Sequence, residues 1–233
     1  MAGEDITIQA ADGGSFSGYL ARPESGSGPG LVVIQEIFGV NTVMRDLTDS
    51  YAAKGYVALC PDLFWRQEPG IQITDKTQAE WDRAFELFGG FDVDLGVGDL
   101  IAALGHLRGL DGCSGKAGSV GYCLGGKLAY LMATRSDADC NVSYYGVGIQ
   151  DLLDEAGNIA KPLLMHIAAE DQFVPAEAQA AIAAGLGGNA HVTMHTYADR
   201  DHAFAREGGE HWNAEAAALA NQRTADFFAA HLG

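Results

Sequence analysis

The stretch Ser119-Val120-Gly121-Tyr122-Cys123-Leu124-Gly125-Gly126 decides how this chain folds. It joins an apolar, strand-like run from Ala117 to Tyr122 to a helical segment from Leu124 to Arg135 with one apolar stripe. A Gly-x-Cys-x-Gly pattern between a strand and a helix predicts a nucleophile elbow, a tight turn that holds its central residue in a sparsely populated backbone conformation. The flanking positions must be glycine because side chains there would collide with the neighbouring strand and helix. The pattern therefore predicts a reactive thiol at Cys123.

Outward from this segment, strands and helices alternate. The chain starts with two extended runs, Asp5 to Ala10 and Phe16 to Pro23, around a glycine-rich turn, which predicts a hairpin. Further strands are expected at Leu31–Ile34, Tyr56–Cys60, Asn141–Tyr145, Leu163–Ala168 and His191–Tyr197. Helices are expected at Asn41–Lys54, 75–88, 92–109, Ala176–Gly185 and Ala214–Ala230, and 62–75 as an excursion over the sheet. This order predicts a single α/β domain over residues 1–233, with a mostly parallel sheet covered by helices on both faces.

Composition narrows the possible partners. Of the 233 residues, 48% are apolar, which is enough to build a core, and 14 Lys and Arg face 31 Asp and Glu, for a formal charge of −17. So acidic a surface disfavours nucleic acid and anionic membranes, and an anionic small-molecule substrate would need local cations. Neither a Walker A string nor a well-placed Gly-x-Gly-x-x-Gly occurs, so we expect no nucleotide cofactor. His191 and His195 share a strand face but have no evident third ligand, so we expect no metal.

The cysteines indicate the compartment. Cys60, Cys113, Cys123 and Cys140 are irregularly spaced, without a disulfide framework or a zinc pattern. The N-terminus has neither the basic nor the apolar region of a signal peptide, so we expect reduced thiols in a cytoplasm. Cys60 and Cys140 lie in or beside apolar strands and are expected to be inert core residues, whereas Cys113 lies in a polar turn.

Partners for the thiol follow two later strands. In open α/β sheets, ligands bind beyond the carboxyl ends of the strands, where Asp171 and His202 stand. The order nucleophile, acid, histidine is that of a hydrolytic triad, in which the histidine takes the thiol proton and the aspartate orients the ring. Rival acids are Glu170, Asp199 and Asp201, each of which is more simply explained as a solvated loop charge. His166, inside an apolar strand, is expected to be a hydrogen-bonded core residue.

Six stretches together resemble a known family. They are QEIFGVN at 35–41, CPDL at 60–63, VGYCLGG at 120–126, YYGVG at 144–148, EDQFVP at 170–175 and DHAFAR at 201–206. Over nearly its whole length the chain resembles the dienelactone hydrolase family of the α/β-hydrolase superfamily. The resemblance implies an eight-stranded sheet, no cofactor, a monomer, and hydrolysis of an enol-lactone of the dienelactone-to-maleylacetate type through a cysteine thioester.

The same resemblance assigns the reacting groups. Cys123, His202 and Asp171 would form the triad. Glu36 would hold the resting thiol and take its proton when substrate binds. The backbone N–H groups of Ile37 and Leu124 would form the oxyanion hole.

Substrate-binding positions match the family less closely. Arg206 matches one of two carboxylate-binding arginines, but the other position holds Trp81, with Arg83 two residues further along the predicted helix. Phe85 stands where a tyrosine is expected, and Ala203 where serine is common. We therefore predict weak carboxylate selectivity and an apolar pocket lined by Phe38, Trp81, Phe85, Phe88 and Tyr144. A broader carboxylesterase or thioesterase, or a non-catalytic redox thiol protein, remains an alternative.

Overall fold

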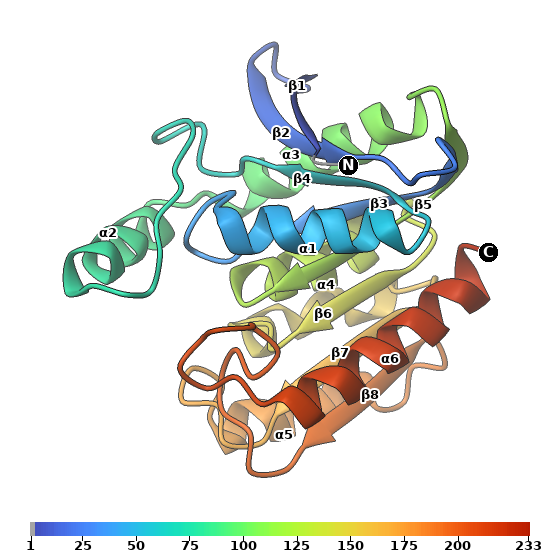
Figure 1. Cartoon of the computed structure of the whole chain (residues 1–233). Coiled ribbons are helices and arrows are strands. Elements are labelled where there is room, and N and C mark those ends of the chain that lie inside the picture. Colours follow the sequence, from blue (N-terminus) through green and yellow to red (C-terminus); the bar gives the residue numbers. More distant parts are fainter. Residues whose placement is uncertain (1–2) are drawn as a thin grey trace. The chain divides into compact units, whose positions relative to one another are not determined.

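The computed structural model describes residues 3–233. Its strands are β1 (Glu4–Gln9), β2 (Ser15–Ala21), β3 (Gly28–Ile34), β4 (Val57–Pro61), β5 (Cys113–Tyr122), β6 (Asn141–Tyr144), β7 (Leu163–Ala168) and β8 (Val192–Tyr197) (Figure 1). Its α-helices are α1 (Thr42–Ala53), α2 (Gln78–Gly89), α3 (Val93–Arg108), α4 (Leu124–Arg135), α5 (Ala176–Leu186) and α6 (Ala214–His231), and η1 (Ile149–Asn158) is a 3₁₀ helix. None of the helices in this range is both long and apolar enough to cross a bilayer.

The strands form one eight-stranded sheet in the order β1-β2-β4-β3-β5-β6-β7-β8. β2 pairs antiparallel with both β1 and β4, whereas β3 with β4, β6 with β7 and β7 with β8 are parallel. The antiparallel hairpin at the start and the parallel strands after it confirm the predicted α/β class.

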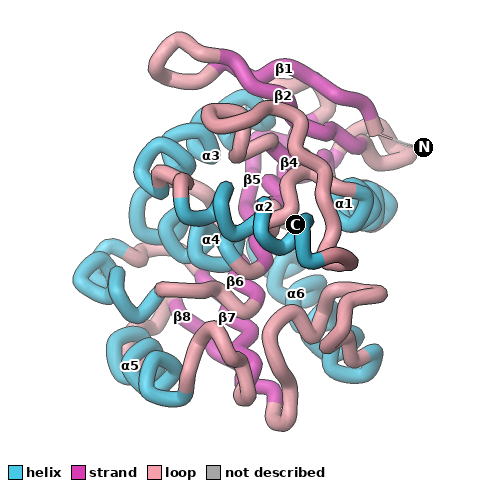
Figure 2. The backbone as a smooth tube through the Cα atoms, turned by 90° about the vertical axis from the view of Figure 1, so that its left-hand side faces the viewer, coloured by secondary structure: helices cyan, strands magenta, loops and turns pink. Residues whose placement is uncertain are grey.

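The chain divides into two compact units, Met1–Ser119 and Val120–Gly233, with β5 running from the first into the second. In the first unit, α1 and α3 cover opposite sides of the strands (Figure 2). In the second, α5 and α6 do the same for β7 and β8 (Figure 2). Helices on both faces were expected from the alternation of strands and helices. That residues 1–233 form a single domain stays a prediction.

Three local features differ from the expectation. β3 begins at Gly28 rather than Leu31, because Gly28 donates its N–H to the Gly112 carbonyl (2.9 Å) and extends the pairing. α2 begins at Gln78 rather than near 75, because the Thr77 side chain caps it by accepting from the Glu80 N–H. The helix η1 was not predicted, although its apolar residues Ile149, Leu152, Leu153 and Ala156 recur at helical spacing.

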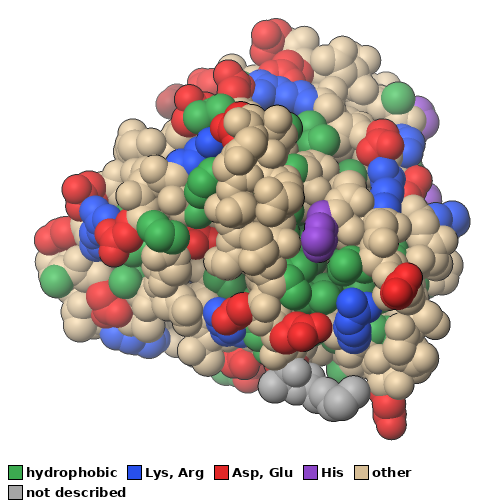
Figure 3. All heavy atoms as spheres, turned by 90° about the horizontal axis from the view of Figure 1, so that it is seen from above, with side chains coloured by type: hydrophobic (Ala, Val, Ile, Leu, Met, Phe, Trp, Pro, Cys, Tyr) green, Lys and Arg blue, Asp and Glu red, His purple; other side chains and the backbone are tan. Residues whose placement is uncertain are grey.

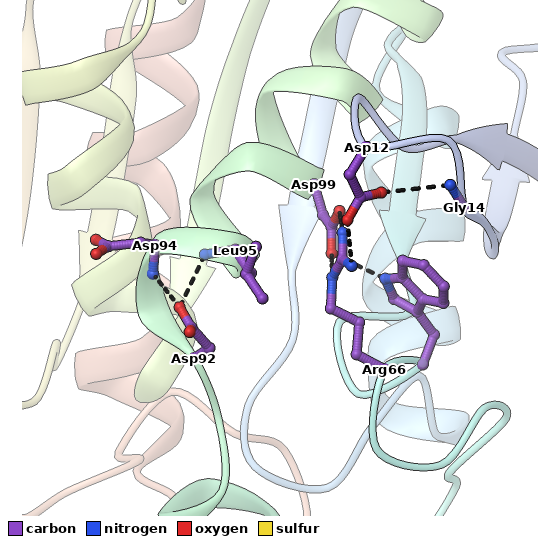
Figure 4. Close-up of polar contacts among 8 residues, drawn as sticks. Asp12, Gly14, Arg66, Asp92, Asp94, Leu95 and Asp99 are labelled. Atoms are coloured by element: carbon purple, nitrogen blue, oxygen red, sulfur yellow. Dashed lines mark hydrogen bonds and ion pairs between the residues drawn. The ribbon is translucent and has the colours of Figure 1, made fainter.

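An ion pair on a buried carboxylate fixes the excursion at 62–75. Asp99 on α3 is 1% exposed, and its two oxygens accept from Nε and Nη2 of Arg66 at 3.0 and 2.7 Å (Figure 4). The Trp65 indole N–H donates to the same carboxylate, and Arg66 also reaches Asp12 in the β1–β2 turn. A bidentate pair of this kind holds its geometry closely. It ties the excursion to α3 and to the hairpin.

His166 on β7 belongs to the core of the second unit, as predicted. It is 1% exposed, with Nδ1 2.8 Å from the Tyr197 hydroxyl and Nε2 2.9 Å from Thr224 Oγ1. Burial lowers the pKa of His166 to about 3, and the charges of His195 and Arg223 act in the same direction. The folded protein therefore holds this imidazole neutral, whereas an unfolded chain protonates it near pH 6.5.

This difference predicts a pH-dependent stability. Between about pH 6.5 and pH 3 the unfolded chain binds the extra proton, so His166 should remove about 1.4 kcal/mol of unfolding free energy per pH unit as the pH falls. His166→Gln cannot titrate and should show a shallower slope in urea unfolding measured from pH 7 to pH 4. The exposed His191→Gln is the matched control and should keep the parental slope. Equal slopes in all three proteins would contradict the assignment.

Candidate active site

Cys123 occupies a strained turn between β5 and α4. Its backbone has φ +57° and ψ −116°, outside the regions that a cysteine normally adopts. A Cβ on Gly121 would lie 1.9 Å from the Gly125 carbonyl oxygen, and one on Gly126 would lie 2.5 Å from the Tyr144 carbonyl oxygen. Only glycine allows these approaches, so the elbow has the geometry that its sequence predicts.

The elbow puts the sulfur at the start of α4. Cys123 is the residue before the helix and is half-buried. The positive end of the helix dipole favours a thiolate there. Leu124 is the first residue of the helix, and N–H groups in a first helical turn have no partner within the helix. The turn can thus offer both a nucleophile and a hydrogen-bond donor to a reacting carbonyl.

His202 and Asp171 form a buried pair in the same unit. His202 Nδ1 lies 2.8 Å from Asp171 Oδ2, and the two residues are 6% and 4% exposed. The other oxygen of Asp171 accepts from the Phe173 N–H at 2.9 Å. Of the rival acids, Glu170 and Asp199 are exposed. The third, Asp201, accepts the backbone N–H groups of His202 (2.6 Å) and Gln172 (3.2 Å) and so joins the two loops.

The electrostatics of His202 connect it to Cys123. Burial alone lowers the pKa of His202, but the charge of the Cys123 sulfur and the hydrogen bond with Asp171 together raise it to about 10. In the part of the chain that the structure describes, Nε2 makes no hydrogen bond of ordinary geometry, so its interaction with the sulfur is mainly one of charge. An imidazolium beside a thiolate is the arrangement that nucleophilic cysteine chemistry requires.

Two aromatic residues at this site were not predicted. Phe173 and Tyr145 each place a ring about 5 Å from the His202 ring, at 4.9 and 5.1 Å between centroids. Their positions in the sequence could have indicated that they lie at the site. Phe173 is two residues after Asp171, and Tyr145 directly follows the end of β6.

The other cysteines behave as predicted for inert thiols. Cys60 and Cys140 are buried, and burial raises the pKa of the Cys60 thiol, so it stays protonated. Cys113 was expected in a polar turn but is the half-buried first residue of β5, and all four cysteines are free. Over residues 3–233, no group of three or more His, Cys, Asp or Glu side chains is arranged to hold a metal ion.

Glu36 and Ile37 lie in the first unit, just after β3. They are 4% and 5% exposed, so Glu36 is a buried carboxylate at the end of β3. Their neighbour Gln35 is fully buried and accepts the Leu63 N–H at 3.0 Å, which fixes the backbone at this point. The catalytic roles of Glu36 and Ile37 stay predictions.

An aromatic shelf, formed by Phe38, Trp81 and Phe85, also lies in the first unit. Trp81 contacts Phe38 edge-on at 5.0 Å and stacks on Phe85 at 5.6 Å. Phe85 is 46% exposed, and the nearby Phe88 is 36% exposed. Because Trp81 donates its indole N–H to the Asp75 carbonyl, the shelf offers mainly carbon surface.

Arg83 is already paired on α2. Its Nη1 donates to Glu86 at 2.5 Å, and its Nη2 donates to Glu68. On the face drawn in Figure 3, most Lys and Arg side chains likewise have acidic neighbours. A carboxylate ligand would have to compete with two carboxylates for Arg83. This placement supports the predicted weak carboxylate selectivity.

Arg206 and Tyr144 are the remaining expected substrate contacts. Arg206 is half-buried in the turn after His202, where its N–H donates to the Ala203 carbonyl at 2.9 Å. Tyr144 has no exposed surface, and its hydroxyl bonds to Thr224 and Asn221 at 2.6 and 3.0 Å. Tyr144 therefore presents no surface to a ligand, contrary to the expectation. Its ring packs against that of its neighbour Tyr145.

The need for glycine in the elbow can be tested by measuring protein stability. Gly121→Ala puts a methyl group against backbone and should lower the free energy of unfolding by about 1–3 kcal/mol. Gly98→Ala is the matched control, because its Cβ meets nothing within 4 Å in α3 and should stabilise the protein by about 0.5–1 kcal/mol. Urea unfolding measures both. An unchanged stability of Gly121→Ala would show that the turn can relax.

Comparisons with known proteins bear on the family and the fold of this chain. The family model described as "Dienelactone hydrolase family" matches residues 16–232. The chain is 58% identical over 235 residues to an Azospirillum brasilense protein provisionally named a carboxymethylenebutenolidase, covering 98% of this chain and 99% of that protein. It is 41% identical over 229 residues to the carboxymethylenebutenolidase of Pseudomonas putida, covering 98% and 97%. A Klebsiella pneumoniae crystal structure provisionally named a dienelactone hydrolase superposes with a TM-score of 0.84 at 26% identity, covering 98% and 99%. The structural match confirms the expected α/β-hydrolase fold.

Proposed function

Because the chain belongs to the dienelactone hydrolase family and is a hydrolase of ester or lactone bonds, we propose that it opens an enol-lactone of the dienelactone type with Cys123 as the nucleophile. The observation that carries the proposal is the raised pKa of His202, to about 10, which the charge of the Cys123 sulfur and the Asp171 hydrogen bond produce against burial. A protonated His202 can form an ion pair with the Cys123 thiolate once the thiol has lost its proton.

Acylation starts from that ion pair. The Cys123 thiolate attacks the lactone carbonyl carbon, and the carbonyl oxygen becomes an oxyanion that the N–H groups of Leu124 and Ile37 stabilise. Such donors typically contribute about 2.7–4 kcal/mol each to lowering the barrier. Collapse breaks the ring C–O bond, forms a thioester and releases an enolate, which stays tethered to the acyl group and takes the His202 proton.

Deacylation uses the same groups. The neutral His202, oriented by Asp171, takes a proton from water as the water oxygen attacks the thioester carbonyl. Collapse breaks the C–S bond, forms the carboxylic acid and returns Cys123 as a thiolate. Glu36 is proposed to accept the thiol proton when substrate binds, so that the resting thiol is protected from oxidation between turnovers.

Substrate recognition is proposed to combine one cation with an apolar surface. Arg206 would bind a carboxylate, as a guanidinium can do with two parallel hydrogen bonds. The aromatic shelf and Phe88 would take the uncharged part. A second candidate is a broader carboxylesterase or thioesterase acting on neutral substrates. The pairing of Arg83 with Glu68 and Glu86 favours it, because Arg83 would have to leave both carboxylates to bind an anionic substrate.

We also propose the compartment, the type of substrate and the oligomeric state of the enzyme. Four free cysteines suit a reducing cytoplasm, and the acidic composition suits a small-molecule substrate rather than nucleic acid. We propose a monomer in which residues 1–233 fold as one domain. Light scattering and a single cooperative unfolding transition would test these two statements.

Removing the thiol or the acid should identify the mechanism. Cys123→Ala should abolish hydrolysis of lactones and esters, and Asp171→Asn should lower kcat by about a thousandfold or more, because the ring loses its tautomer and orientation. Cys113→Ala is the control and should keep the parental rate. If Cys123 were only a redox thiol, Asp171→Asn would leave its oxidation by peroxide nearly unchanged. Turnover by Cys123→Ala would refute the proposed nucleophile.

Substrate preference tests the recognition proposal. We expect kcat/KM for an anionic dienelactone to exceed that for a neutral lactone or ester of similar size by only a small factor. Phe85→Ala should raise KM for the neutral substrate by roughly tenfold, since apolar surface leaves the shelf. Arg83→Ala should change neither value. A strong preference for the anion that Arg83→Ala removes would show that Arg83 binds the substrate carboxylate.

A further inference from the structure

The His202 imidazole contacts two aromatic rings. The Phe173 ring is 4.9 Å away at an interplanar angle of 75°, and the Tyr145 ring is 5.1 Å away at 64°. Both arrangements are edge-to-face contacts within the range that aromatic pairs prefer. Phe173 is 41% exposed and Tyr145 is 2% exposed, so one ring is an outer cover and the other an inner support.

Both rings are fixed to the frame that carries the acid and the base. The Phe173 N–H donates to Asp171 Oδ1 at 2.9 Å, so the outer ring and the carboxylate share one turn. The Tyr145 N–H donates to the His166 carbonyl at 2.8 Å, and its ring packs on the fully buried Phe204 at 5.7 Å. Neither ring can move far without moving the hydrogen bonds around it.

The imidazole needs such support. Asp171 holds only Nδ1, and the χ2 torsion of a histidine has broad minima, so the ring can tilt about that hydrogen bond. A tilt changes where Nε2 points and therefore its interaction with the Cys123 sulfur. The contacting rings limit the tilt. The outer ring further limits water, as the His202 side chain is only 8% exposed.

We propose that Phe173 and Tyr145 act as an aromatic clamp, a pair of positioning residues that keeps the His202 ring aligned between Asp171 and Cys123. The inference rests on the proposed catalytic role of His202. Of the two clamp residues, Phe173 can be substituted without disturbing the core, because much of its side chain is exposed to water. Tyr145 lies in the core and is unsuitable for the test.

The test compares Phe173→Ala with Phe173→Leu. In Phe173→Ala, kcat should fall by between about tenfold and a hundredfold, because small misplacements of a catalytic group cost this much, and KM should stay close to its parental value. Phe173→Leu keeps a bulky apolar cover and should retain most of kcat. Proton NMR of the resting enzyme follows the downfield Nδ1 proton that His202 shares with Asp171. This resonance should broaden through solvent exchange in Phe173→Ala and persist in Phe173→Leu.

Phe227→Ala is the matched control. Phe227 makes the same kind of edge-to-face contact with His231 at 4.7 Å on α6, so its loss removes an aromatic–histidine pair outside the site. This variant should keep both kcat and the Nδ1 resonance, and the melting temperature of Phe173→Ala should match the parent. Unchanged kcat and resonance in Phe173→Ala would overturn the clamp, as would a change confined to KM, which indicates substrate contact. Because the resonance needs no turnover, it tests the clamp even if Cys123→Ala shows that the proposed function is wrong.

Discussion

The close approach of backbones at the β5–α4 turn is the constraint on which the reacting groups depend. Cys123 keeps φ +57° only because Gly121 and Gly126 allow carbonyl oxygens to come nearer than any side chain would permit. The same turn puts the sulfur at the helix N-terminus and leaves the Leu124 N–H without a helical partner. In the proposed reaction, this one backbone conformation would supply the nucleophile, a helix dipole that favours its charge and a donor for the oxyanion. The residue is strained by about 1–3 kcal/mol, which the surrounding packing must offset.

The positions of Asp171 and His202 depend on a second feature, the hydrogen bonds that join the loops after β7 and β8. Asp171 and His202 are 31 residues apart and follow neighbouring parallel strands, β7 and β8. Strand pairing brings the loops to the same edge, but not to hydrogen-bonding distance in a fixed orientation. Asp201 does this by accepting from N–H groups of both loops. The carboxylate that looked like a rival for the catalytic acid therefore positions the acid and the base relative to each other.

The glycine-rich turn and the joined loops explain which features the sequence could predict. Apolar runs, their order and the glycines around Cys123 are local signals, so the parallel sheet, the elbow and the places of Asp171 and His202 followed from them. The 3₁₀ helix at 149–158 was missed, although its apolar residues recur at helical spacing. The pairing of Arg83 with Glu68 and the contact of Phe173 with His202 depend on where side chains from separate turns end up. No spacing rule contains that information, because exposed side chains are placed by tertiary contacts and not by local propensity.

The division of roles between the units bears on how specificity can vary. Cys123, Asp171 and His202, together with both clamp rings, lie in residues 120–233, and their hydrogen bonds and ring contacts are formed within that unit. The aromatic shelf and Arg83 lie in residues 1–119 on a helix that shares none of those bonds. Substitutions that share no partners have nearly additive effects. A substitution on the shelf should therefore leave the hydrogen bonds and ring contacts around His202 unchanged. Because the shelf shares none of those bonds, the residues that set the reaction type can stay the same while those that select the substrate vary.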